Sequence, residues 1–153
     1  LLGSIKERKE EFDKTEIYLE KALKIKGDDP VILNYYGYTL IATGRNVDKG
    51  IELVNRALKL DPENTSYLDS LAWGYFKKGE LQKALEIQEK VYEKENDNAV
   101  IVYHLAEIYY KLGKKDDAIK LFKKTKELLQ KTKDVSPWER REIESRLRSL
   151  GIL

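Results

Sequence analysis

The sequence repeats itself with a period of 34 residues, and this feature constrains the fold more than any other. The clearest recurring pairs are Leu71–Leu105, Ala72–Ala106, Tyr75–Tyr109 and Gly79–Gly113. A fixed period of this length is typical of arrays in which each repeat is one small unit that stacks on its neighbours. A single unit cannot bury its apolar face alone, so the stack as a whole must form a continuous core.

Small residues follow the same period along the whole chain. One series of small residues is Ala22, Ala57, Val91 and Thr125, and a second is Thr15, Gly50, Ala84 and Ala118. A third is Gly3, Gly37, Ala72 and Ala106, and each of its members directly follows a larger residue, in turn Leu2, Tyr36, Leu71 and Leu105. Two helices joined by a tight turn need small side chains where their backbones approach and larger ones alongside. The larger residues expected to fill the grooves are Leu33, Leu40, Leu68, Tyr75, Val102, Tyr109 and Phe122. Gly44, Gly79 and Gly113 stand where a glycine commonly ends a helix. The pattern therefore predicts a series of antiparallel helix hairpins.

This period and pattern resemble the tetratricopeptide repeat family. The resemblance implies an all-α fold, a right-handed superhelical array of antiparallel helix hairpins (an α-solenoid) with a C-terminal capping helix. We expect repeats over residues 1–132, at about 1–29, 30–64, 65–98 and 99–132, and the capping helix within 133–153. The run Leu68–Trp73 is similar to bacterial multi-repeat proteins. High Lys and Glu content without Cys or Met suits a thermophilic source.

Local signals refine the two ends of the array. In the first repeat we expect one helix over Leu1–Lys9 and a second over Lys14–Lys26, the second started by a capping box of Asp13 and Glu16. Between Gly44 and Gly50 the spacing is one residue longer than in the next two repeats. At the other end, Ser136-Pro137-Trp138-Glu139 is a further capping-box signal with proline at the first helical position. The helix that follows carries an apolar stripe of Trp138, Ile143, Leu147 and Leu150, which favours a cap over the last repeat rather than a partner-binding helix.

Composition and motifs exclude several classes of function. The chain of 153 residues has no Cys, one His and a formal net charge of +2, so disulfides and thiolate zinc sites are absent and general nucleic-acid binding is not indicated. No apolar run approaches the roughly 20 residues that span a bilayer. The lone His104 lies inside a helix, and no nucleophile, phosphate-binding or metal-protease motif is present. We therefore predict no enzyme activity, no catalytic or metal site and no cofactor.

In the family that the sequence resembles, the first helix of each hairpin lines a concave face, where ligands bind at fixed offsets. Carried over by register, the groove positions are Asn34, Tyr38, Ile41 and Ala42, then Asp69, Trp73, Phe76 and Lys77, then Tyr103, Glu107, Tyr110 and Lys111. Five of them are aromatic, and aromatic side chains dominate interface hot spots. The resemblance thus implies a non-catalytic scaffold that binds a partner protein segment, extended or helical. Asp69 and Asn34 are expected to bond a peptide backbone, with Lys77 and Lys111 meeting an acidic group at the rim.

Alternatives remain open from the sequence. The aromatic residues also suit a role in plugging a narrow superhelix or packing against a further helix. The Lys, Arg and Asn cluster with which some family members clamp a C-terminal carboxylate is replaced here by Tyr38, Asp69, Trp73 and Glu107, which argues against that ligand. The chain lacks Met, which indicates a fragment or processed form of a longer protein. The alternatives to a binding scaffold are a self-association module of a larger protein and an accessory domain of an enzyme outside this segment. The sequence is compatible with the cytoplasm or the periplasm.

Overall fold

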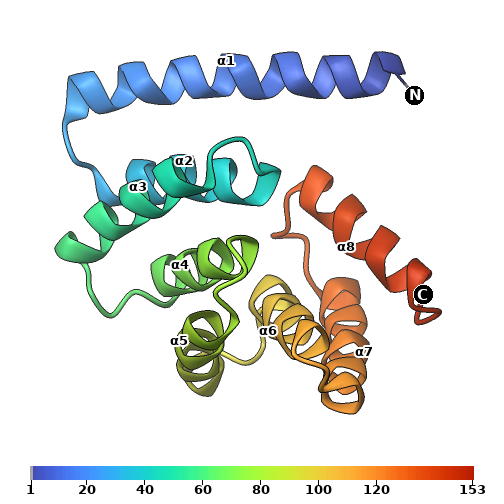
Figure 1. Ribbon diagram of the computed structural model, residues 1–153. Helices are drawn as coiled ribbons and strands as arrows, with labels where there is room; N and C mark the ends of the chain where they lie inside the picture. The colour runs from blue at the N-terminus through green and yellow to red at the C-terminus, as the bar shows by residue number, and fades with distance from the viewer. Residues whose placement is uncertain (1) are drawn as a thin grey trace.

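The computed structural model describes residues 2–153, with side chains from residue 8 onward, and this part of the chain forms eight helices and no strand. The helices are α1 (Leu2–Lys26), α2 (Pro30–Thr43), α3 (Val47–Leu60), α4 (Thr65–Lys77), α5 (Leu81–Lys94), α6 (Ala99–Lys111), α7 (Lys115–Lys131) and α8 (Pro137–Ser149). Three antiparallel hairpins, α2–α3, α4–α5 and α6–α7, stack in order, as Figure 1 shows. The predicted all-α solenoid is confirmed.

The hairpins close where the sequence has its smallest residues. A Cβ atom on Gly37 would lie 2.7 Å from the carbonyl oxygen of Gly50, so the backbones of α2 and α3 approach too closely for any side chain at this point. In the later hairpins alanines take these places, and Ala84 and Ala118 are fully buried. Among the larger residues expected to fill the grooves, Leu33, Leu40, Val102 and Phe122 are buried and Leu68, Tyr75 and Tyr109 half-buried.

The turns use glycine as expected. Gly44, Gly79 and Gly113 have φ angles of 71°, 82° and 85°, in the left-handed region that favours glycine. The additional residue after Gly44 is present, because Arg45 and Asn46 precede α3 whereas Glu80 alone separates Gly79 from α5. The Asn46 side chain accepts a hydrogen bond from the Lys49 amide and so caps α3.

The first repeat is not a hairpin, and here the sequence-based prediction is wrong. Helices expected over Leu1–Lys9 and Lys14–Lys26 are one continuous helix, α1, although Leu1 itself lies outside the described residues. Glu10 stands 34 residues before Gly44, so the position that turns the chain in the later repeats holds a good helix former. The expected capping box does not form either, since the Asp13 carboxylate pairs instead with Arg45. Gly27 follows the last residue of the helix, with φ of 70°.

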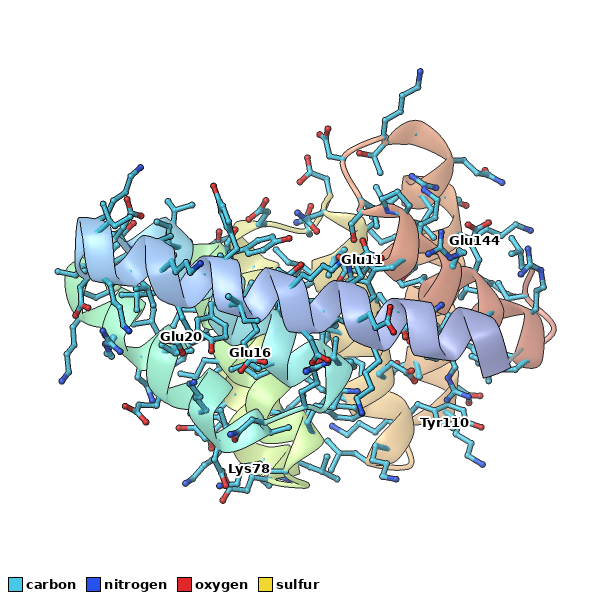
Figure 2. The ribbon with its side chains drawn as sticks, turned by 90° about the horizontal axis from the view of Figure 1, so that it is seen from above. Glu11, Glu16, Glu20, Lys78, Tyr110 and Glu144 are labelled. Carbon is cyan, nitrogen blue, oxygen red and sulfur yellow. The ribbon has the colours of Figure 1, made fainter. Side chains whose placement is uncertain are left out.

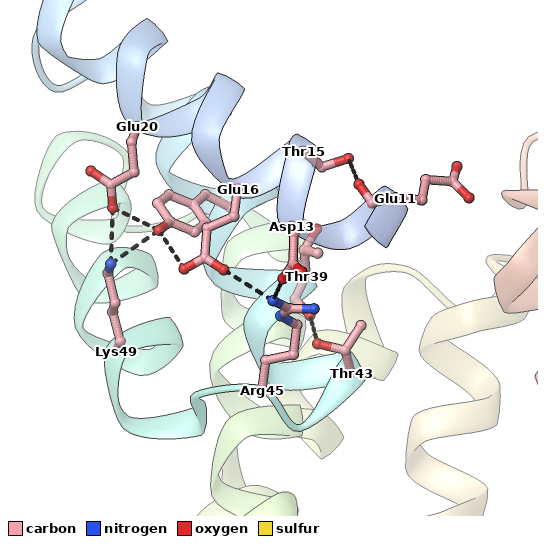
Figure 3. A network of polar contacts seen from close by, with 10 residues as sticks. Glu11, Asp13, Thr15, Glu16, Glu20, Thr39, Thr43, Arg45 and Lys49 are labelled. Atoms are coloured by element: carbon pink, nitrogen blue, oxygen red, sulfur yellow. Dashed lines mark hydrogen bonds and ion pairs between the residues drawn. The ribbon is translucent and has the colours of Figure 1, made fainter. Parts of the chain in front are cut away.

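The carboxyl-terminal half of α1 packs on the first complete hairpin. Leu19 is buried in a cluster with Leu33 and Leu40 of α2. Around it lies the polar network of Figure 3, in which the Tyr36 hydroxyl lies 2.6 Å from Glu20 Oε1 and the Lys49 ammonium donates to the same oxygen at 2.8 Å. Burial, and then the Glu20 hydrogen bond, raise the pKa of Tyr36 to about 12. These contacts hold α1 across the end of the array.

The helix α8 covers the last repeat, as predicted, and it also contacts α1 at the other end of the array. Ile143 and Leu147 are buried in one cluster with Phe122 and Leu129 of α7, which covers the last repeat as expected. The amino-terminal end of α8 reaches to the opposite end of the array, where Trp138 packs edge-on against Phe12 of α1 with ring centroids 5.9 Å apart. Figures 1 and 2 both show the amino-terminal half of α1 extending past α2 and α3 toward α8. The predicted Ser136 capping bond is wrong, since its side chain makes no capping hydrogen bond, although Pro137 does start the helix.

Candidate interaction groove

The helices α2, α4 and α6 form one face of the array, and α8 lies against it. Between them is a cavity of about 120 Å³. It is lined on one side by Tyr38, Ala42, Trp73, Phe76, Lys77, Tyr103, His104 and Glu107, and on the other by Trp138, Glu139, Glu142 and Ile143 of α8. Eight of the lining residues thus come from the stacked helices and four from the helix that closes the groove.

Aromatic rings form the floor of this groove. Trp73 is stacked between Phe76, with centroids 4.5 Å apart, and His104, with centroids 4.0 Å apart. The Tyr103 ring is tilted against the same indole, with ring centroids 6.2 Å apart. Only 6% of the Trp73 surface is exposed. The floor is therefore a rigid, preformed apolar surface that joins α4 to α6.

Beneath the floor runs a chain of polar side chains from α5 to α8. The Asp69 carboxylate accepts a hydrogen bond from Gln88 Nε2 at 2.6 Å, and the same oxygen lies 2.8 Å from His104 Nδ1. His104 Nε2 lies 3.4 Å from the Tyr38 hydroxyl, which donates to the Glu139 carboxylate. Buried polar groups need partners of this kind because an unpaired one is costly. Through this chain Glu139 of α8 is coupled to the interior of the array.

Burial sets the protonation of the two groups at the outer end of this chain. It raises the pKa of the Tyr38 hydroxyl well above its usual range, with Glu139 and Asp69 adding to the effect. Burial also raises the pKa of the Glu139 carboxyl, against the opposing effect of the Tyr38 hydrogen bond. The site therefore favours a neutral Tyr38 and resists the negative charge on Glu139.

At the other end of the groove Glu107 holds α8 by an ion pair. Arg146 Nε lies 3.1 Å from each Glu107 carboxylate oxygen, and the Tyr103 hydroxyl donates to Glu107 Oε2 at 2.9 Å. The Arg146 guanidinium also lies over the Tyr110 ring, 4.9 Å from its centroid. Paired and stacked guanidinium groups of this type are strong, geometrically specific anchors.

Seven predicted groove residues come together around the cavity: Tyr38, Ala42, Trp73, Phe76, Lys77, Tyr103 and Glu107. Tyr110 lies beside it, beneath Arg146. Lys111 is exposed and does not line the cavity, and Asn34 is half-buried with its Oδ1 atom lacking a hydrogen-bond partner among the described residues.

Two predicted groove residues are assigned wrongly. Ile41 is fully buried, and its side chain fills the space above Gly50 and Gly74, so it belongs to the core between hairpins. Asp69 is also buried, and its carboxylate is bonded to Gln88 and His104 in the interior instead of being presented to a peptide backbone as expected. The register carried both positions to the correct helices. It did not show which way each side chain is directed.

The sequence analysis missed the contribution of His104 and of α8. His104 directly follows Tyr103, which lies one period of 34 residues after Asp69, and this was the available signal that His104 and Asp69 lie at nearly the same level of neighbouring helices. Glu139 and Arg146 are seven residues apart and therefore share a helix face, but nothing local indicates that this face meets the groove. Within residues 8–153 no group of His, Asp or Glu side chains is arranged to hold a metal ion. Across the described helices none combines the length and apolar character needed to cross a membrane.

Comparisons with known proteins agree with this architecture. Residues 1–29 match the family model "Tetratricopeptide repeat", and residues 44–125, more than half of the chain, match "Anaphase-promoting complex, cyclosome, subunit 3". A curated relative, the TPR repeat-containing protein PA4667 of Pseudomonas aeruginosa, is 28% identical over 101 residues, which are 66% of this chain and 17% of that protein. The chain thus spans about a sixth of that relative's length.

Solved structures with low sequence identity share the fold. The thermophilic TPR protein TTC0263 of Thermus thermophilus has a TM-score of 0.72 at 21% identity, covering 99% of this chain and 80% of that one. A MamA crystal structure has a TM-score of 0.60 at 24% identity, covering 84% of this chain and 69% of that one. The Sgt2 TPR domain of Aspergillus fumigatus has a TM-score of 0.58 at 22% identity, covering 80% of this chain and 79% of that one. The repeat register, the stacked hairpins and these matches together show that the chain belongs to the tetratricopeptide repeat family.

Proposed function

We propose that this chain is a non-catalytic scaffold that binds a helical segment of a partner protein in the aromatic groove of α2, α4 and α6. Tetratricopeptide repeat folds are in general scaffolds for protein–protein interaction. The observation that carries the finer proposal is that this groove already accommodates a helix. The contacts of α8 with Tyr38 at one end and Glu107 at the other support a surface shaped for helical ligands.

The chemistry of the groove supports this function. A rigid aromatic floor offers a large contact area at low cost in conformational entropy, as is typical of interface hot spots. Two polar anchors at opposite ends fix the direction and register of a helix laid along it. Lys77 is exposed at the rim, with its ammonium 5.3 Å from the Trp73 ring centroid, and is available to a partner.

Selection from a displayed library of helical peptides, followed by photo-crosslinking, tests the proposal. A photoreactive residue at Lys77, on the groove rim, should label the selected helices. The same residue at Lys90, exposed on α5 outside the groove, should not label them. Labelling from Lys90 but not from Lys77, or the selection of no binder, would contradict the proposal.

A second candidate function is self-association through α1, which is favoured by its exposed apolar side chains. Tyr18 is 73% exposed and Ile25 84% exposed. By register Tyr18 corresponds to Leu53, which is 4% exposed because it packs among the α2 residues Leu33 and Tyr36. In α1 no first helix of a hairpin covers this position, so a second copy of the chain is the proposed occupant.

Sedimentation over a range of concentrations tests self-association. Tyr18→Lys with Ile25→Lys should convert an associating chain into a monomer. Leu60→Lys is a matched control, because Leu60 is 55% exposed on α3 and lies outside the α1 face. A wild-type chain that stays monomeric at every concentration would rule this function out, as would association that survives both α1 substitutions.

A further inference from the structure

We infer that α8 is a built-in competitor for the groove, and that the partner is an amphipathic helix with a carboxylate, a branched aliphatic residue and an arginine at positions i, i+4 and i+7. In α8 these positions are Glu139, Ile143 and Arg146. The inference rests on the proposed function and adds to it the chemical pattern that the groove recognises.

The three residues occupy one face of α8, because positions i, i+4 and i+7 fall within about 60° of one another on a helix with 3.6 residues per turn. Each meets a different part of the array. Glu139 accepts from Tyr38 of α2, and Arg146 pairs with Glu107 of α6. Ile143 lies between them, buried, and lines the cavity. The face that contacts the groove is therefore a compact three-point anchor.

The chemistry of the two ends specifies the direction of the helix. The Tyr38 end offers a hydroxyl donor backed by His104, which suits an acceptor. The Glu107 end offers a carboxylate already bonded by Tyr103, which suits a cation. A helix laid in the opposite direction would place its carboxylate against Glu107, and like charges at close range are strongly disfavoured.

Several features make α8 a replaceable occupant. It has 13 residues, near the limit at which isolated helices are marginal. Its Glu139 carboxylate is held where burial disfavours its charge. It also leaves Lys77 exposed at the groove rim. A longer partner helix with the same three anchors would keep these contacts and add others.

The experiment uses the full chain and a fluorescent synthetic peptide of residues 133–153, with binding followed by anisotropy. In the wild-type chain α8 competes at the high effective concentration of a tethered ligand, so the peptide should bind weakly. Arg146→Glu in the chain places two carboxylates together and loosens the tethered helix while leaving Glu107 free for the peptide. The substitution removes the Arg146–Glu107 ion pair from the tethered α8, while the peptide can still form it. This variant should therefore bind the peptide at least about tenfold more tightly than the wild type does.

The matched control is the same peptide carrying both Glu139→Arg and Arg146→Glu. It has the composition and net charge of the natural peptide, with the two charged residues exchanged. It should bind the Arg146→Glu chain at least about tenfold more weakly than the natural peptide. Equal binding of the two peptides, or no binding of either, would overturn the inference. Arg146→Ala serves as the second loosened chain. If circular dichroism shows both variants unfolded, α8 is an inseparable part of the core and the inference also fails.

Failure of the inference is distinguishable from failure of the proposed function. Library-selected helices that label from Lys77 but lack the three-residue pattern would keep the groove function and reject the pattern. Helices that do not label from Lys77 would reject the groove itself.

Discussion

Trp73 stacks on His104 with ring centroids 4.0 Å apart and ring planes 18° apart, and this contact joins the second and third complete hairpins at the floor of the groove. The same imidazole is bonded on one side to Asp69 and approaches Tyr38 on the other. The floor of the groove is thus continuous with the interior of the protein. Groove and core share side chains here.

Replacement of Trp73 should therefore destabilise the fold. Trp73→Ala removes a ring that is 6% exposed and packed on both faces, and we expect the free energy of unfolding to fall by about 3–5 kcal/mol. Chemical denaturation followed by circular dichroism measures this loss. Trp73→Phe should cost clearly less because it keeps an aromatic ring in the stack. A Trp73→Ala protein with wild-type stability would contradict the packing described here.

Glu139→Gln should change how stability depends on pH. Burial raises the pKa of the Glu139 carboxyl above its ordinary 4.5, with Asp69 and Glu142 nearby adding to the shift while Tyr38 and His104 oppose it. A group whose pKa is raised in the folded state contributes stability below the unfolded value and loses it as the pH rises through the folded value. Glutamine stays neutral and still accepts from Tyr38. The variant should thus gain stability relative to wild type as the pH rises above 4.5.

Thermal or urea unfolding of both proteins at matched pH values measures this difference. Glu144→Gln, farther along α8 and outside the cavity lining, is the control and should follow the wild-type curve. If the difference between Glu139→Gln and wild type is constant with pH, the buried carboxyl does not titrate as described.

Glycine substitutions should separate close packing from turn geometry. Gly37→Ala places a Cβ atom 2.7 Å from the Gly50 carbonyl oxygen, so α2 and α3 must move apart. We expect a net loss of about 1–3 kcal/mol, even though alanine improves helix propensity by about 1 kcal/mol. Gly44→Ala meets no atom within 4 Å and suffers only the strain of its φ of 71°, about 1–2 kcal/mol. A Gly37→Ala chain as stable as wild type would contradict the close approach of α2 and α3.

The continuity of α1 can be measured directly, because the chain has no native cysteine to interfere with spin labelling. Labels at Lys9 and Lys24, both exposed, are 15 residues apart and should lie about 22 Å apart along a continuous helix. Electron paramagnetic resonance should give one narrow distance distribution near that value. Glu10→Gly, which supplies the turn residue of the later repeats, should add a shorter population. A short distance in the wild type would mean that the first hairpin is closed.

Much of the fold could be predicted because it depends on local rules that recur. Glycines at Gly44, Gly79 and Gly113 turn the chain through backbone angles that other residues adopt with strain, and alanines such as Ala84 fit where helices cross. The first repeat escaped prediction because its periodic small residues, including Thr15 and Ala22, persist while the turn residue is absent. Periodicity reports which residues share a face, and it does not report whether the chain reverses.

The candidate site was only partly predictable for a related reason. Register placed Tyr38, Trp73 and Glu107 on the helices that line the groove, and these residues do meet there. It could not distinguish them from Ile41 and Asp69, since neighbouring offsets on one helix differ only in the direction of their side chains. That direction depends on the helices packed around them.

The sequence by itself determined the hairpin repeat, its turns and the family, because each depends on interactions between residues close in the chain or one period apart. Only the tertiary structure decided that Glu139 and Arg146, from α8, close the groove on Tyr38 and Glu107. Those contacts join residues 101 and 39 positions apart, and their strength comes from burial and charge pairing that exist only once the array has stacked.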